Sequence, residues 1–233
     1  MFVDVVEAAA FGTNCYVLAP AAGEECLVVD PGIGVEAELL DRLRAHRLRP
    51  AAVLLTHGHL DHVWSVTPVC AAGGVAARIH GADRYRLADP LGGLGPQLRA
   101  ALAAEFGPET RWQEPSDVVE VTDGETLRLA GLEVDVVHAP GHTEGSVMFA
   151  VRRPGREDLL LSGDVLFAGS VGRTDLPGGD TAALLHSLAT RVLPLPDGTD
   201  VAPGHGPATT IGRERAVNPY LRQLVPPASE KEF

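Results

Sequence analysis

The sequence predicts an α/β domain in which two β-sheets pack together and helices cover their outer faces. Short strand-like runs occur in both halves of the chain, and amphipathic helical segments lie among them. The length of 233 residues suits one such domain, so we expect a single domain over residues 1–233. Hydrophobic residues make up 45% of the chain and charged residues 21%, which is enough to bury a core.

Strand-like runs dominate the first third of the chain. Residues Thr13–Leu18 and Glu25–Asp30 read as strands, and the second ends in Asp-Pro-Gly, a strong turn signal. Residues Glu36–Arg47 carry three leucines at helical spacing between charged residues, which predicts an amphipathic helix. The continuous apolar run Ala51–Thr56 indicates a buried strand.

The rest of the chain alternates between segments with helical hydrophobic spacing and segments with strand-like apolar runs. We predict helices at Val63–Ala72 and Thr181–Val192, and strands at Val75–Ile79, Val118–Val121, Thr126–Leu129, Leu132–His138, Ser146–Val151, Asp158–Ser162 and Asp200–Ala202. Residues 82–115 are rich in Ala, Leu, Gly and Pro, and we interpret them as a helical insertion that could form a lid. Residues 211–233 are interpreted as a short C-terminal tail.

Four side chains of the metal-binding type follow the predicted strand Ala51–Thr56 within six residues: His57, His59, Asp61 and His62. In an extended segment, residues two apart project the same way, so the first two imidazoles can bind one ion. If a helix begins near Asp61, the other two side chains can face a second ion. Buried His and Asp side chains are costly without partners, so core packing is a poor explanation for this cluster.

Three more ligand-type residues lie beside glycines at predicted strand ends. His142 occurs in Pro-Gly-His-Thr, Asp164 in Ser-Gly-Asp and His205 in Pro-Gly-His-Gly. Each alone is more typical of an ordinary turn. Together with the first cluster, however, they favour a metal site.

The HxHxDH signature and these three later motifs, in this order, resemble the metallo-β-lactamase superfamily. Within it, the stretches 163–167 and 172–180 look most like the glyoxalase II-like hydrolases, also called hydroxyacylglutathione hydrolases. The resemblance implies an αββα sandwich of two mixed sheets flanked by helices. It also implies one metal at His57, His59 and His142, a second at Asp61, His62 and His205, and Asp164 as a bridge. The cofactors would be two divalent metal ions, zinc in the first instance, with iron or manganese as alternatives.

The implied reaction is hydrolysis of a thioester by a metal-bound hydroxide, because bound water can ionise near neutral pH and a thiolate leaves readily. By analogy, Asp61 would orient the hydroxide as well as bind metal. Arg173 lies in a glycine-rich loop and could bind a substrate carboxylate; equally, it could pair with Asp175 and brace that loop. Glyoxalase II enzymes carry a basic C-terminal helical domain that this sequence lacks, so another thiol conjugate or a simple thioester also fits.

Two alternatives remain open at this point. One is a persulfide dioxygenase with a single iron, which shares the Gly-Arg-Thr-Asp run but differs at Leu176-Pro177. The other is a non-catalytic protein that binds metal. A β-lactamase is disfavoured because many of its zinc enzymes have Cys in place of Asp164.

The net charge limits the classes of partner that we expect, and the cysteine content indicates the cell compartment. The net charge of −12 would repel nucleic acids and anionic membrane surfaces, so we expect neither as a partner and disfavour a nuclease. Three widely spaced cysteines suit a reducing compartment, and the first residues show no secretory signal. We therefore expect a cytoplasmic protein acting on a small thioester; a homo-oligomer is left open.

Overall fold

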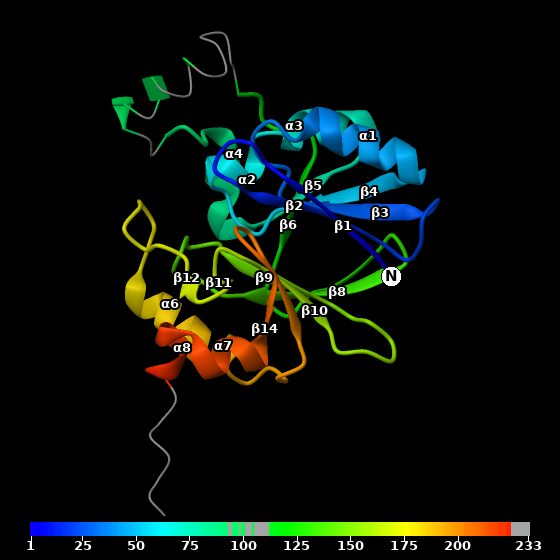
Figure 1. Cartoon of the computed structure of the whole chain (residues 1–233). Coiled ribbons are helices and arrows are strands. Elements are labelled where there is room, and N and C mark those ends of the chain that lie inside the picture. Colours follow the sequence, from blue (N-terminus) through cyan, green and yellow to red (C-terminus); the bar gives the residue numbers. More distant parts are fainter. Residues whose placement is uncertain (93–94, 98, 101–103, 105–111, 225–233) are drawn as a thin grey trace, which may run out of the picture.

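The structure, a computed structural model, describes residues 1–92, 95–97, 99–100, 104 and 112–224 of the chain. These residues form four layers, with helices outside two packed β-sheets (Figure 1). The predicted fold class, two mixed sheets flanked by helices, is confirmed. Among the described residues, no helix has the length and apolar character needed to cross a membrane.

The first sheet contains six strands in chain order. They are β1 (Phe2–Glu7), β2 (Asn14–Ala19), β3 (Glu25–Val29), β4 (Arg49–Leu54), β5 (Ala77–His80) and β6 (Val118–Val121). The first three pair antiparallel, and β3 to β6 pair parallel. The edge strand β1 is not predicted from the sequence, because Asp4 interrupts its apolar run and Val3 and Val5 are exposed.

The second sheet also contains six strands. Their spatial order is β14 (Thr209–Thr210), β13 (Asp200–Pro203), β10 (Leu159–Gly163), β9 (Val147–Val151), β8 (Leu132–His138) and β7 (Thr126–Leu129). Strand β9 is antiparallel to both β8 and β10, and β10 is parallel to β13. Strands β8, β10 and β13 therefore all end at the same edge of the sheet. A separate pair, β11 (Leu166–Phe167) and β12 (Ser170–Val171), follows β10.

Helices cover the outer face of each sheet. On the first sheet lie α1 (Glu36–His46) and α3 (Val66–Gly73); on the second lie α6 (Thr181–Ser187), η2 (Leu188–Val192), α7 (Ile211–Val217) and α8 (Pro219–Arg222) (Figure 1). Three short helices lie near the edge of the sheets that carries the predicted metal-binding residues. They are α2 (Leu60–Val63), η1 (Gly81–Asp83) and α4 (Arg84–Ala88). The predicted long helix Thr181–Val192 is present, but its second half is a π-helix.

Both faces of the central strands are buried, which explains their continuous apolar sequences. In β2, Tyr16 and Leu18 pack between the sheets with residues of the second sheet such as Phe149. The alternate residues Cys15 and Val17 belong to the core under α1 and α3. All three cysteines are free and buried, so they act as small core residues.

The two predicted additions to the domain are described in part. The expected helical insertion at 82–115 begins with η1 and α4, but residues 93–94, 98, 101–103 and 105–111 lie outside the described residues. Residues 211–224 of the expected tail form α7 and α8 and pack on the second sheet, whereas 225–233 lie outside the described residues.

Candidate metal centre

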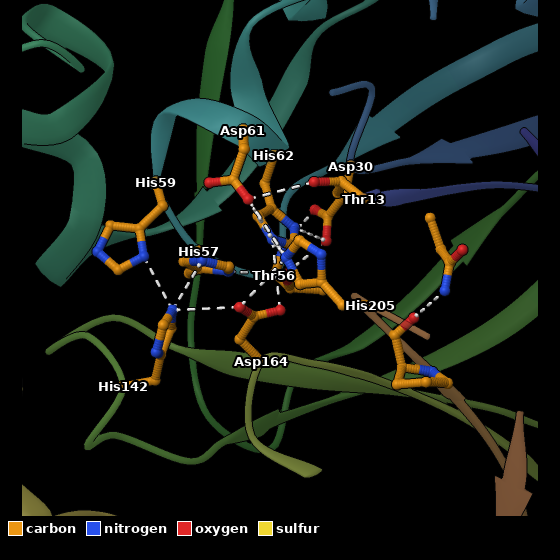
Figure 2. Close-up of polar contacts among 12 residues, drawn as sticks. Thr13, Asp30, Thr56, His57, His59, Asp61, His62, His142, Asp164 and His205 are labelled. Carbon is orange, nitrogen blue, oxygen red and sulfur yellow. Dashed lines mark hydrogen bonds and ion pairs between the residues drawn. The ribbon is translucent and has the colours of Figure 1, made fainter. Parts of the chain in front are cut away.

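All seven ligand-type residues predicted from the sequence lie together where four strands end (Figure 2). The HxHxDH segment follows β4 in the first sheet, and His142, Asp164 and His205 follow β8, β10 and β13 in the second. Backbone hydrogen bonds join the sheets at this edge, from Val147 N to Thr56 O at 2.8 Å and from Asn14 N to Gly204 O at 2.7 Å. The carboxyl ends of these strands therefore place the side chains at one point.

The first group consists of His57, His59 and His142. Nε2 of His142 lies 3.2 Å from Nε2 of His57 and 2.8 Å from Nδ1 of His59. His59 lies in extended backbone directly before α2, so its ring projects to the same side as that of His57. Three ring nitrogens thus converge on one position.

The second group consists of Asp61, His62 and His205. Nε2 of His205 lies 3.2 Å from Nε2 of His62 and 3.2 Å from Oδ2 of Asp61. Helix α2 begins at Leu60 and carries Asp61 and His62, which face His205. The His62 ring also lies beside the His57 ring, with 4.2 Å between the centroids.

Asp164 lies between the two groups (Figure 2). Its Oδ1 is 3.3 Å from Nε2 of His62, and its Oδ2 is 3.5 Å from Nε2 of both His142 and His205. Asp164 Oδ1 is buried and accepts no hydrogen bond. A buried carboxylate oxygen without a donor is costly, which is the arrangement expected of a metal ligand.

The hydrogen bonds on the far side of the rings show which nitrogens face inward. In four imidazoles Nδ1 contacts an oxygen: Thr56 Oγ1 for His57 (3.0 Å), Asp30 Oδ2 for His62 (2.9 Å), Arg173 O for His142 (2.8 Å) and Phe11 O for His205 (3.1 Å). A carbonyl or carboxylate can only accept, and the Thr56 hydroxyl donates to Asp30, so each Nδ1 carries the hydrogen. In the neutral rings, Nε2 then presents a lone pair to the centre. Facing lone pairs repel unless a cation lies between them, so these residues fit a pair of metal ions.

The charges of the two groups differ. Burial, with the His142 imidazole adding to it, lowers the pKa of His59 to about 3; burial also lowers the pKa of His142. Burial acts to lower the pKa of His62 as well, but the carboxylates of Asp164 and Asp61 outweigh it and raise that pKa well above its usual range. The first group therefore offers neutral imidazoles, which bind metal without losing a proton. The second group lies in the negative field of the Asp61 and Asp164 carboxylates, which favours binding of a cation.

A cavity of about 770 Å³ opens onto the two groups. His59, Asp61, His142, Asp164 and His205 line it on the metal-binding side, and its other walls include Phe11, Leu60, Phe167, Val171, Leu176 and Pro177. Arg173 also lines this cavity. Its guanidinium forms a two-point ion pair with Asp175, with both N–O distances at 2.7 Å.

The sequence analysis missed the residues that orient the ligands. Asp30 accepts from the backbone N–H and the hydroxyl of Thr56 and contacts His62, yet in the sequence it reads only as part of a turn. Thr13 donates to Asp61 at 3.2 Å. A carboxylate at the end of an apolar strand, followed by Pro-Gly, is the local sequence signal that could have indicated such a role.

A sequence profile described as the metallo-beta-lactamase superfamily matches residues 8–205. The chain belongs to the metallo-β-lactamase superfamily. The match includes all seven ligand-type residues and ends at His205.

Two relatives with curated descriptions are similar to this chain over nearly its whole length. It is 44% identical to an uncharacterized protein of Mycobacterium tuberculosis over 96% of this chain and 99% of the other. It is 34% identical to hydroxyacylglutathione hydrolase GloC of Haemophilus influenzae over 95% of this chain and 98% of that protein.

Two solved structures are similar along nearly the whole chain. The B3 metallo-beta-lactamase BLEG-1 superposes with a TM-score of 0.78 at 36% identity, covering 94% of this chain and 99% of the other. TTHA1623, solved in a di-iron-bound form, superposes with a TM-score of 0.73 at 37% identity, covering 94% and 100%. The family, these relatives and the His/Asp groups together indicate a metallo-hydrolase with a site suited to two metal ions.

Proposed function

We propose that this metallo-hydrolase cleaves thioesters, as a glyoxalase II-like enzyme acting on a hydroxyacyl-thiol conjugate. The observation that carries the proposal is the position of Asp164 between two three-residue ligand groups at the wall of a cavity large enough for a small substrate. Similarity to a hydroxyacylglutathione hydrolase over 95% of the chain supports the choice of a thioester.

The ligand groups define what each residue would do. His57, His59 and His142 would hold one divalent ion, and Asp61, His62 and His205 the other, with Asp164 shared. Zinc and iron both accept such nitrogen and oxygen ligands. When bound, the ions would lower the pKa of water and polarise an acyl carbonyl.

Asp61 is the residue we assign to orienting the attacking water. Its carboxylate lines the cavity, and its Oδ2 is fixed by the Thr13 hydroxyl. Burial acts to raise the pKa of Asp61, but the His62 and His205 imidazoles outweigh it and hold the pKa below its usual range. Asp61 is therefore ionised at neutral pH and can accept a hydrogen bond from water.

The cavity walls suggest how substrate would bind. The side chains of Phe167, Val171 and Leu176 offer an apolar surface to the carbon skeleton of the substrate. We assign a substrate carboxylate to Arg173. Its ion pair with Asp175 is exposed, and exposed pairs contribute little, so the guanidinium can exchange one carboxylate for another.

The test combines metal analysis with a substrate panel. Protein loaded with zinc, iron or manganese is assayed with S-lactoylglutathione, neutral thioesters and a β-lactam, and for oxygen uptake with glutathione persulfide. We expect thioester turnover that His59→Ala abolishes together with binding of the ion at the first group. Unchanged turnover in His59→Ala would refute the site, and oxygen uptake by an iron form without thioester cleavage would refute hydrolysis.

The variant Arg173→Gln tests whether Arg173 binds the substrate carboxylate or only stabilises its own loop. It should raise KM for S-lactoylglutathione and leave KM for a neutral thioester unchanged. Phe167→Ala should lower kcat/KM by roughly ten-fold for a long acyl chain, as the loss of a buried apolar contact implies. If Arg173→Gln raises KM equally for both substrates, Arg173 stabilises its own loop and does not bind the substrate carboxylate.

The β-lactam in the panel covers a second candidate function. The 36% identity to a B3 metallo-beta-lactamase over 94% of the chain favours including amide hydrolysis. Cleavage of the β-lactam with no activity on any thioester would replace our proposal with this one.

A further inference from the structure

Asp83 is a buried carboxylate that lies outside the ligand groups and joins the two loops that bear the first group. The residue ends η1 and has no exposed surface. Its Oδ2 accepts from Gly58 N at 2.8 Å and from the Thr143 hydroxyl at 2.8 Å. Its Oδ1 accepts from Gly145 N at 2.9 Å.

These donors flank the three ligands of the first group. Gly58 lies between His57 and His59, and Thr143 directly follows His142. The two loops come from different sheets and are 85 residues apart in sequence between His57 and His142. One carboxylate therefore sets the distance between the ligand that the second sheet contributes and the two that the first sheet contributes.

Both loops pack directly against the η1–α4 segment. A Cβ added to Gly145 would lie 2.6 Å from the backbone nitrogen of Asp83, and one added to Gly58 would lie 2.6 Å from Cβ of Arg86. The hydrogen bonds of Asp83 therefore add a side-chain link between the loops to the backbone hydrogen bond from Val147 N to Thr56 O.

Arg86 compensates the buried charge of Asp83. Its Nε lies 3.3 Å from Asp83 Oδ1, and a terminal nitrogen donates to Glu144 Oε2 at 2.7 Å and to Pro177 O at 2.9 Å. A buried carboxylate is tolerated when its oxygens receive hydrogen bonds and an opposite charge is close. Both conditions hold here, because three donors and the Arg86 guanidinium contact the Asp83 carboxylate.

The second group is held by residues that do not hydrogen-bond to Asp83. Among the described residues, Asp61, His62 and His205 contact Thr13, Asp30 and the Phe11 carbonyl. Of these supports, Asp30 also reaches the first group, through the Thr56 hydroxyl and His57. We propose that Asp83 is a positioning residue that preassembles the His57, His59 and His142 group and sets its metal affinity selectively. The inference concerns metal binding and does not depend on which substrate the enzyme cleaves.

The test measures zinc affinity by competition with a chromophoric chelator, using the full chain. Asp83→Asn replaces one of the two acceptor oxygens with an amide nitrogen that cannot accept a hydrogen bond. We expect one of the two zinc sites to weaken ~10–100-fold, the usual effect of losing an outer partner of metal ligands. Wild-type affinity at both sites in a folded Asp83→Asn protein would overturn the proposal.

Double variants assign the weakened site. In His205→Ala, the remaining ion depends on the first group, and adding Asp83→Asn should weaken it by the same factor. In His59→Ala, the remaining ion depends on the second group, and adding Asp83→Asn should leave its affinity unchanged, because the two changes act on one site. Equal weakening in both backgrounds would show a general structural effect and overturn the selectivity.

Glu214→Gln is the matched control. Glu214 is equally buried and accepts from Gly169 N, the Thr209 hydroxyl and the Asn218 amide, but it does not contact a ligand-bearing loop. It should lower stability and leave both zinc affinities unchanged. If Asp83→Asn does not fold, Thr143→Val decides, because it removes one donor to Asp83 Oδ2 and should weaken the same site to a smaller degree; unchanged affinity there would overturn the proposal.

Discussion

The Asp30 carboxylate and the His62 imidazole form a buried pair, with 2.9 Å between Oδ2 and Nδ1. The same oxygen accepts from the Thr56 hydroxyl at 2.6 Å, and that hydroxyl in turn contacts Nδ1 of His57. One carboxylate therefore orients a ligand in each metal group. Asp83, by contrast, binds the two loops of the first group and Arg86.

Asp30→Asn should weaken zinc binding at both groups by ~10–100-fold. The amide offers one acceptor oxygen, whereas the carboxylate uses one oxygen for Thr56 N and the other for His62 Nδ1 and the Thr56 hydroxyl, which contacts His57. Chelator competition measures the two affinities. The control is Asp135→Asn. Asp135 lies in β8, where it pairs with Arg152 away from the ligands, so its loss should leave both affinities unchanged. Loss at a single group only would contradict the shared role of Asp30.

Asp164→Asn should reduce the bound metal from two ions to one. The substitution removes a negative charge next to His62, His142 and His205 and one of the two oxygens that face them. We expect turnover to fall by more than the ~100-fold that an outer partner can account for. Metal content by plasma emission is the measurement, with the exposed Asp41→Asn as control. Two tightly bound ions in Asp164→Asn would show that Asp164 is not shared.

Gly204→Ala should disrupt the metal centre while the fold persists. A Cβ there would lie 2.3 Å from Asp164 Oδ1 and 2.8 Å from Cε1 of His62, so one of these side chains must move. We expect loss of zinc with an unchanged far-ultraviolet circular dichroism spectrum. Gly95→Ala, where an added Cβ meets no atom of the described residues within 4 Å, should retain both ions. Full zinc content in Gly204→Ala would contradict the close packing.

Asn218→Ala should destabilise the protein by ~1–3 kcal/mol, because it leaves buried groups without partners. The amide donates to Ser170 O at 3.0 Å and Glu214 Oε2 at 2.9 Å, and its oxygen caps α8 by accepting from Tyr220 N. Urea unfolding measures the loss. Asp180→Ala, which removes only the exposed cap of α6, should cost less. An equal loss would mean that the buried contacts of Asn218 contribute little.

The three cysteines should be unreactive toward thiol reagents at pH 8 in the folded protein. Burial, with Glu25 adding to it, raises the pKa of Cys26 to about 12; burial and then Asp117 raise the pKa of Cys70 to about 12. Unfolded thiols ionise near pH ~8.5, so the unfolded state loses protons that the folded state retains. Stability should therefore decline from about pH 9 upward. In urea unfolding at several pH values, Cys26→Ala should show a shallower decline, and an identical slope would contradict this assignment.

Several elements follow from local sequence pattern. The leucines at helical spacing in Glu36–Arg47 predict α1, which spans Glu36–His46. The runs Leu132–His138 and Val118–Val121 are strands with the predicted bounds. The edge strand β1 and the two-residue strands β11, β12 and β14 escape prediction, because they bury little continuous apolar surface or are too short to show a period.

For the site, the sequence by itself determined the ligand types and the spacing within the HxHxDH segment, because neighbouring residues on one loop are placed by local backbone geometry. Only the tertiary structure decided that His142, Asp164 and His205 meet that segment at one edge, and that Asp30 and Asp83 orient it. These contacts join residues 25 or more positions apart, and they depend on how strands of two sheets are paired and packed. The same holds for the cavity wall. The ion pair between Arg173 and Asp175, two positions apart, is one of the two roles that the sequence offered for Arg173.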